Sequence, residues 1–187
     1  GGRVDREALL PGLAAWRRVV DWRLGRIEAM PEVSLYPESP MTVDDVLASG
    51  TRHVIVATGA TWRRDGRGRS LGRAVDGWDS DAVLTPDDVL DDLVAGTWSV
   101  PDGRVVVYDD DHYVMGGLLA ELLATRGHQV TLVTAAPLAS YWTQFTLEQE
   151  RIESRLRALG VDVVVRQTMT RVDGSSVVLA SVIDGAE

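Results

Sequence analysis

The sequence predicts an α/β fold whose sheet is mainly parallel. Apolar runs of strand length alternate with segments of helical periodicity. One block is a complete βαβ unit: a strand at residues 104–108, a helix that ends at Gly127 and a strand at residues 130–133. A helical crossover makes the two flanking strands parallel and gives the connection a right hand. Alternation of this kind is typical of a sheet covered by helices.

Turn residues and periodicity indicate the other elements. Thr85 and Pro86, followed by two acids, mark a helix start, because a threonine side chain caps free N–H groups and proline fits the first turn. Further helices are expected at residues 13–30, 42–49 and 146–159. Further strands are expected at residues 33–36, 53–57, 161–165 and 177–183. A turn at residues 173–174 leaves the last strand pair open to an antiparallel arrangement.

Composition excludes several classes of function. The chain has no cysteine, so it holds no disulfide, no zinc–thiolate site and no cysteine-ligated iron–sulfur cluster, which fits a cytoplasmic origin. No apolar run approaches the roughly 18 residues of a membrane span. The net charge of -9 argues against a nucleic-acid binder. Arginines gather at residues 63–69, where we expect a solvated loop, with a phosphate-facing or partner-facing loop as the alternative.

Two small-residue motifs indicate a first nucleotide site. Ala57-Thr58-Gly59 follows the strand expected at residues 53–57, and Gly1-Gly2 opens the chain. Small residues at the carboxyl end of a strand let the backbone approach a nucleotide. An ordinary glycine turn is the alternative for the first motif, and a cloning remnant for the second. Because no strand and glycine-rich turn precede residue 1, we expect a truncated domain.

The turn of the βαβ unit departs from a dinucleotide fingerprint. The three fingerprint glycines should fall near Asp111, Tyr113 and Gly116, and only the third position is glycine. The first two glycines let the pyrophosphate touch the backbone. At about 4–8 Å and an effective dielectric of about 20–40, each aspartate of residues 109–111 would cost on the order of 1–4 kcal/mol beside a phosphate. The sequence therefore predicts a Rossmann-like unit that does not bind NAD(P).

Other side chains give weaker signals. A metal site at residues 109–112 is an alternative, although consecutive residues on one turn do not all reach one ion. His53 and His128 flank expected strands and are interpreted as structural. We find no catalytic Ser-His-Asp, Cys-His or paired-carboxylate pattern, so no catalytic residue is expected within the segment.

The motifs together resemble a known family, the trimethylamine, dimethylamine and histamine dehydrogenases. The resemblance runs along nearly the whole chain, and its most specific parts are the last two stretches. The similar stretches are PGLAAW at 11–16, PMTVDDVL at 40–47, ATGATWR at 57–63, LTPDDVL at 84–90, YDDDHYVMG at 108–116, and PLASYW at 137–142 with FTLE at 145–148.

The resemblance implies an organisation that the residues alone do not show. It implies a doubly wound, mainly parallel sheet of the FAD/NAD(P)-binding type, with residues 1–100 as a partial ADP- or FAD-type domain and residues 101–187 as an incomplete NAD(P)-domain-like unit. ADP would be bound by motif residues of the first part, with Met41 as a weaker candidate. These residues are Gly1, Gly2, Met41, Ala57, Thr58 and Gly59. No cofactor is expected to bind tightly to the segment alone.

The resemblance also implies what lies outside the segment. Members carry covalent FMN and a four-iron cluster in a β/α barrel, where the amine is oxidised, and they pass electrons to an electron-transferring flavoprotein. A homodimeric parent is expected, with no nucleic-acid or membrane partner. Two alternatives stay open: a fragment of an NADPH-dependent 2,4-dienoyl-CoA or enoate reductase, and a non-catalytic module that docks a partner.

Overall fold

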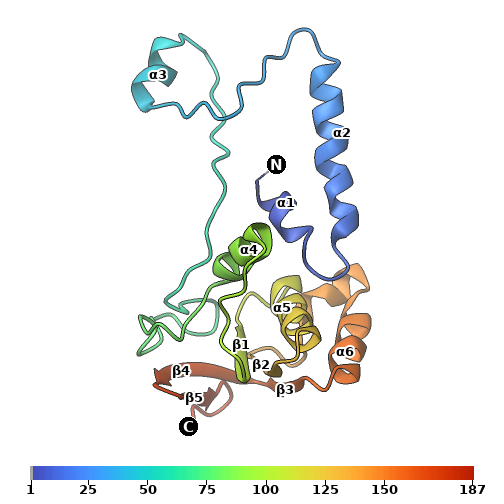
Figure 1. Cartoon of the computed structure of the whole chain (residues 1–187). Helices are drawn as coiled ribbons and strands as arrows, with labels where there is room; N and C mark the ends of the chain where they lie inside the picture. Colours follow the sequence, from blue (N-terminus) through green and yellow to red (C-terminus); the bar gives the residue numbers. More distant parts are fainter. Residues whose placement is uncertain (1) are drawn as a thin grey trace.

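A three-stranded parallel sheet lies in the lower part of the molecule, beneath α4 and α5 in the view of Figure 1. The computed structural model describes residues 2–187. Its strands β1 (Arg104–Asp109), β2 (Gln129–Thr134) and β3 (Asp162–Val165) lie in the order β1-β2-β3. Arg104 lies opposite Gln129, and this register continues to Asp109 opposite Thr134. The parallel βαβ unit expected from the sequence is confirmed.

Helix α5 (Val114–Thr125) supplies most of the core beside this sheet. Its sequence is apolar almost all round, as befits a helix packed against β1, β2 and the neighbouring helix α6 (Gln149–Ala158). Leu132 of β2 and Leu156 of α6 are fully buried in the same cluster. Burying one such side chain contributes about 1.5–3 kcal/mol, so this cluster is the main source of stability.

The chain beyond β3 forms an antiparallel hairpin. Strand β4 (Gln167–Asp173) pairs with β5 (Ser176–Ser181) across the expected turn, and β4 contacts β2. β4 itself was not expected from the sequence. A 3-10 helix η2 (Tyr141–Thr146), which was not expected from the sequence, precedes α6, and α6 begins at Gln149 rather than at residue 146.

Several helices lie N-terminal to the sheet. They are α1 (Arg3–Glu7), η1 (Ala14–Trp16), α2 (Arg17–Glu28), α3 (Val43–Ala48) and α4 (Pro86–Ala95). Thr85 caps α4, as the sequence predicted, and its side chain also forms a reciprocal pair with Asp88. α4 brings the fully buried Leu90 into the core, where Leu10 of the α1–η1 connection also packs. Among residues 2–187 no helix has the length and apolar character to cross a membrane.

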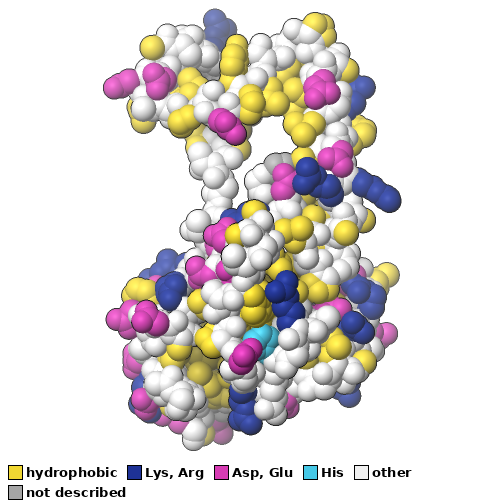
Figure 2. Space-filling view, viewed as in Figure 1, with side chains coloured by type: hydrophobic (Ala, Val, Ile, Leu, Met, Phe, Trp, Pro, Cys, Tyr) yellow, Lys and Arg dark blue, Asp and Glu magenta, His cyan; other side chains and the backbone are white. Residues whose placement is uncertain are grey.

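The strands expected at residues 33–36 and 53–57 are absent, which corrects the sequence prediction. Both segments lie in an arm, residues 30–60, that extends away from the sheet and carries α3 (Figure 1). Ile55 is 92% exposed, and His53 is exposed rather than structural. An apolar strand needs a neighbouring strand to satisfy its backbone, and none is found for these segments within residues 2–187. Apolar side chains therefore face solvent along the arm (Figure 2).

Candidate functional site

The carboxylate of Asp109 bonds to the backbone of the turn between β1 and α5. This residue ends β1 and is 3% exposed. Its Oδ1 atom accepts hydrogen bonds from the backbone N–H groups of Asp111 (3.2 Å) and His112 (2.9 Å). Burial raises the pKa of the Asp109 carboxyl to about 6, against the lowering effect of the bond from His112. Within residues 2–187 its Oδ2 atom has no hydrogen-bond partner.

Gly116 lets α5 approach this carboxyl group. A Cβ atom at Gly116 would lie 2.6 Å from both Cβ and Cγ of Asp109, closer than atoms pack. The third fingerprint position is therefore glycine for the reason that the fingerprint gives, close packing of helix on strand. Tyr113, at the second position, is the N-cap residue of α5 and stays 40% exposed. The contacts that fill the turn come from aspartates rather than from the tyrosine ring.

Asp110 holds a distant loop on the same turn. One of its carboxylate oxygens lies 2.9 Å from the backbone nitrogen of Ser70, and the other lies 2.5 Å from the Ser70 hydroxyl, which donates to it. The Asp110 side chain is only 8% exposed. Nε2 of His112 lies 3.2 Å from Asp110 without a hydrogen bond, so these two groups attract each other when the imidazole is protonated.

The loop at residues 63–75 is exposed at Arg63 and at residues 67–70, in agreement with the solvated loop that we expected, and it also contacts the turn. Arg69 stacks over the ring of Trp142 in η2 at 4.7 Å, and the backbone N–H of Trp142 donates to the carbonyl of His112 at 2.9 Å. At the base of the loop, the N–H of Val75 donates to the carbonyl of Asp65. Arg67 remains exposed. No sequence pattern indicated the Ser70–Asp110 contact, because it joins residues 40 positions apart.

The residues proposed for the first nucleotide site are only partly brought together. Gly1 lies outside the described residues. The guanidinium of Arg3, the residue after Gly2, donates to the carbonyl of Ala60 at 3.1 Å, so one long side chain links the start of α1 to the residue after Gly59. Met41 is 62% exposed and lies apart, beside α3.

Backbone geometry at this place suits a close approach by a nucleotide. Gly2 and Gly59 have φ angles of 60° and 80°, a region that favours glycine. No atom lies within 4 Å of the position of a Cβ atom on either residue, so space is open beside both. Gly12, Gly50 and other exposed glycines share both features, so the features permit a nucleotide at Gly2 and Gly59 without selecting this place. Gly2 is also the N-cap residue of the five-residue helix α1.

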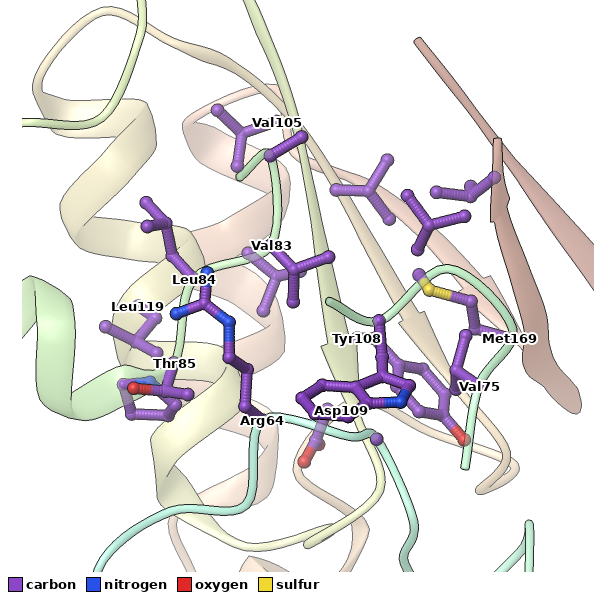
Figure 3. Close-up of a pocket in the computed structure, with 18 of the residues that line it drawn as sticks. Arg64, Val75, Val83, Leu84, Thr85, Val105, Tyr108, Asp109, Leu119 and Met169 are labelled. Atoms are coloured by element: carbon purple, nitrogen blue, oxygen red, sulfur yellow. The ribbon is translucent and has the colours of Figure 1, made fainter. Parts of the chain in front are cut away.

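A cavity of about 890 Å³ runs along the free edge of β1 (Figure 3). Its walls are mostly apolar, with Val105 and Leu119 on the sheet and helix side and Val75 and Met169 opposite. Arg64 lies among the polar groups that line it. Five arginines line it in all, Arg63, Arg64, Arg67, Arg69 and Arg104, so its polar part carries positive charge. Among residues 2–187, no three acidic or histidine side chains come together to hold a metal ion.

Comparison with known proteins supports the α/β fold described above. Residues 84–186 match the family model of the OYE-like second alpha/beta domain. The chain belongs to this family. All of this chain also superposes on a part, 26%, of a 2-naphthoyl-CoA reductase, with a TM-score of 0.69. At 18% identity this likeness concerns the fold alone.

Amine-oxidising enzymes are the similar proteins at higher identity. The structure of 6-hydroxypseudooxynicotine amine oxidase from Pseudomonas geniculata N1 superposes with a TM-score of 0.90, at 44% identity over 99% of the chain. Histamine dehydrogenase from Rhizobium sp. 4-9 gives a TM-score of 0.86, at 42% identity over 99% of the chain. Dimethylamine dehydrogenase from Hyphomicrobium sp. (strain x) is 32% identical over 97% of it.

The family resemblance read from the sequence is thereby confirmed: the chain is homologous to dimethylamine and histamine dehydrogenases. It spans only a part of these relatives, 25% of the dimethylamine dehydrogenase, 27% of the amine oxidase and 28% of the histamine dehydrogenase.

Proposed function

We propose that this chain is the nucleotide-domain segment of a flavin- and iron–sulfur-dependent amine dehydrogenase, which we call the parent protein. The parent would oxidise a small amine by N-dealkylation or deamination and pass electrons to an electron-transferring flavoprotein. The supporting observation is the identity of 44% and 42% to two amine-oxidising enzymes over 99% of the chain.

The segment would have a structural role in the parent. We propose a partial ADP- or FAD-type domain at residues 1–100 and an incomplete Rossmann-like, doubly wound unit at residues 101–187. Chemistry would occur elsewhere, on FMN, which accepts the electrons of the amine when it is bound in the parent. The absence of a catalytic pattern in the sequence supports this division. A homodimeric parent and a cytoplasmic location remain part of the proposal.

ADP would bind beside Gly2 and Gly59, in the first of the two nucleotide-type domains. Gly2 and Gly59 offer open space and suitable backbone angles, and the Arg3–Ala60 contact brings their segments together. We propose that Gly1, Gly2, Ala57, Thr58 and Gly59 contact it. Met41 remains the weaker candidate, because it lies in the exposed arm. Among these residues Gly2 caps only the five-residue helix α1, which is a weak site for a pyrophosphate, so the isolated chain should bind ADP weakly. Micromolar affinity by calorimetry would contradict this.

Two alternatives to this proposal make different predictions, a reductase fragment and a docking module. A reductase that takes hydride from NADPH needs a turn open to pyrophosphate, whereas Asp109 bonds to the backbone of this turn and Asp110 holds Ser70 against it. A docking module would bind its partner through the acidic charge of the chain, -9, and its affinity would fall with added salt.

The proposal is tested on the parent protein. It would be mixed anaerobically with NADPH, NADH and a panel of small amines while the flavin absorbance is followed. An amine should bleach the flavin and the nicotinamides should not. Rapid bleaching by NADPH would favour the reductase instead.

A further inference from the structure

The loop at residues 66–71, which we call the Ser70 loop, lies over the turn at residues 109–112. The turn ends strand β1, and the carboxyl ends of parallel strands form the crevice in which open α/β sheets bind ligands. The turn also leads into α5, a helix of 12 residues whose N-terminus attracts anions. The place taken by the Ser70 loop is therefore the one where a pyrophosphate would be expected.

Two carboxylates of the chain already lie at the turn where a pyrophosphate would be expected. Asp109 accepts the N–H groups of Asp111 and His112 from inside the turn, and it is almost fully buried there. Asp110 faces the other way and receives the N–H and hydroxyl of Ser70. The turn thus holds negative charge on both sides, and the chain itself uses the N–H groups of Asp111 and His112.

The fit between Asp110 and the Ser70 loop is tight. A Cβ atom at Gly68 would come within 2.1 Å of an Asp110 carboxylate oxygen, so a larger residue at position 68 would push the loop off the turn. The Asp110 side chain is 8% exposed, so little water reaches it and its carboxylate depends on the hydrogen bonds from Ser70. The stacking of Arg69 on Trp142 fixes the loop on a second side.

We propose that Asp110 is a positioning residue that keeps this turn closed: its carboxylate holds the Ser70 loop in the place of a dinucleotide. The Ser70 loop is then the occupant of the turn, and nicotinamide dinucleotides do not displace it. This inference deepens the proposed function, because it names the residue that excludes NADPH from the segment.

Trypsin tests the role of Asp110 on the 187-residue chain. The Ser70 loop contains two cleavage sites, after Arg67 and Arg69, and both side chains are exposed. A protease must draw the flanking backbone into an extended stretch, which the hydrogen bonds between Ser70 and Asp110 oppose. Asp110→Ala removes hydrogen bonds to a charged group and should raise the cleavage rate at both sites by about 10-fold or more. Asp111→Ala removes the same charge from the same turn and should leave the rate unchanged.

Reference sites separate loop release from general unfolding. Cleavage after Arg126 and Arg155, next to and within the packed helices, should stay at the wild-type rate in Asp110→Ala. Faster cleavage at all sites would mean that Asp110 only supports global stability, and an unchanged rate in the Ser70 loop would mean that it does not hold the loop. Either result would overturn the proposal.

Two further measurements test proximity and occupancy. The chain has no cysteine, so the pair Ser70→Cys with Asp110→Cys should form a disulfide under mild oxidation much faster than Ser70→Cys with Asp111→Cys. Equal rates would refute the contact. Millimolar NADPH should leave cleavage after Arg67 unchanged in the wild-type chain, and a clear change would show that a dinucleotide reaches the turn. None of these outcomes depends on whether amines reduce the parent protein.

Discussion

At the residue scale, the contact between Gly116 and Asp109 allows α5 to lie close to β1. Gly116→Ala would place a methyl group 2.6 Å from two Asp109 atoms. Since neither helix nor buried carboxyl moves freely, the substitution should lower the free energy of unfolding by about 1–3 kcal/mol, measured by urea denaturation. Gly25→Ala in α2 is the matched control, because no atom lies within 4 Å of its Cβ position. It should raise stability by about 0.5–1 kcal/mol, and a loss in both variants would rule out the steric explanation.

The buried carboxyl of Asp109 makes stability depend on pH. Its folded-state pKa is raised from 3.8 to about 6, so the unfolded chain loses this proton at a lower pH than the folded chain. Its contribution to stability is therefore present below pH 4 and is lost as the pH rises to 6, by about 3 kcal/mol. Asp109→Asn keeps an acceptor for the two backbone N–H groups and removes the charge.

Urea denaturation of both proteins at several pH values checks this prediction. Asp109→Asn should be the more stable protein at pH 7–8, and the difference should shrink towards pH 4. If the two curves ran parallel across this window, the titration of Asp109 would not be linked to folding.

Sequence reasoning identified Gly116 as the one fingerprint glycine of the turn but predicted no packing role for it. That role appears in the structure, where α5 lies close to Asp109 at this position. The obstruction was assigned to Tyr113 and to the three aspartates as a group. Their separate roles depend on Ser70, and no local pattern encodes a contact across 40 positions.

At the element scale, two helices begin with the same capping box but differ in packing. Thr85 and Asp88 start α4, which buries Val89 and Leu90, whereas Thr42 and Asp45 start α3, which buries nothing. Thr85→Ala should cost about 1 kcal/mol and lower the Tm by about 2–4 °C. Thr42→Ala should leave the Tm unchanged, because the cooperative unit does not include α3. Equal shifts in circular dichroism melts would show that the arm unfolds with the core.

The same contrast explains which elements the sequence could predict. The βαβ unit, α4 and α6 satisfy their apolar faces within the chain, so local pattern and tertiary packing agree. Residues 53–57 have the composition of a buried strand and yet lie extended and exposed. Strand formation depends on a neighbouring strand, which local sequence cannot supply.

At the scale of the whole molecule, unpaired apolar surface should make the isolated chain self-associate. The arm exposes 52% of Val54, 92% of Ile55 and 79% of Val56, and β1 pairs on only one side within residues 2–187. Unpaired strand edges and apolar runs favour association. Ile55→Lys should shift the chain towards monomer in sedimentation velocity, and Leu47→Lys in α3 is the control for added charge in the arm. Monomeric wild-type chain at high concentration would contradict the prediction.

The central claim is that the turn at residues 109–116 takes no nicotinamide dinucleotide, and a calorimetric titration of the 187-residue chain with NADPH and NADH tests it most directly. Because Asp109 accepts the N–H of His112 and Asp110 accepts the N–H of Ser70, we predict no heat of binding up to millimolar ligand. Saturable binding with a micromolar Kd, weakened by Gly116→Ala, would place a dinucleotide on this turn and contradict the account.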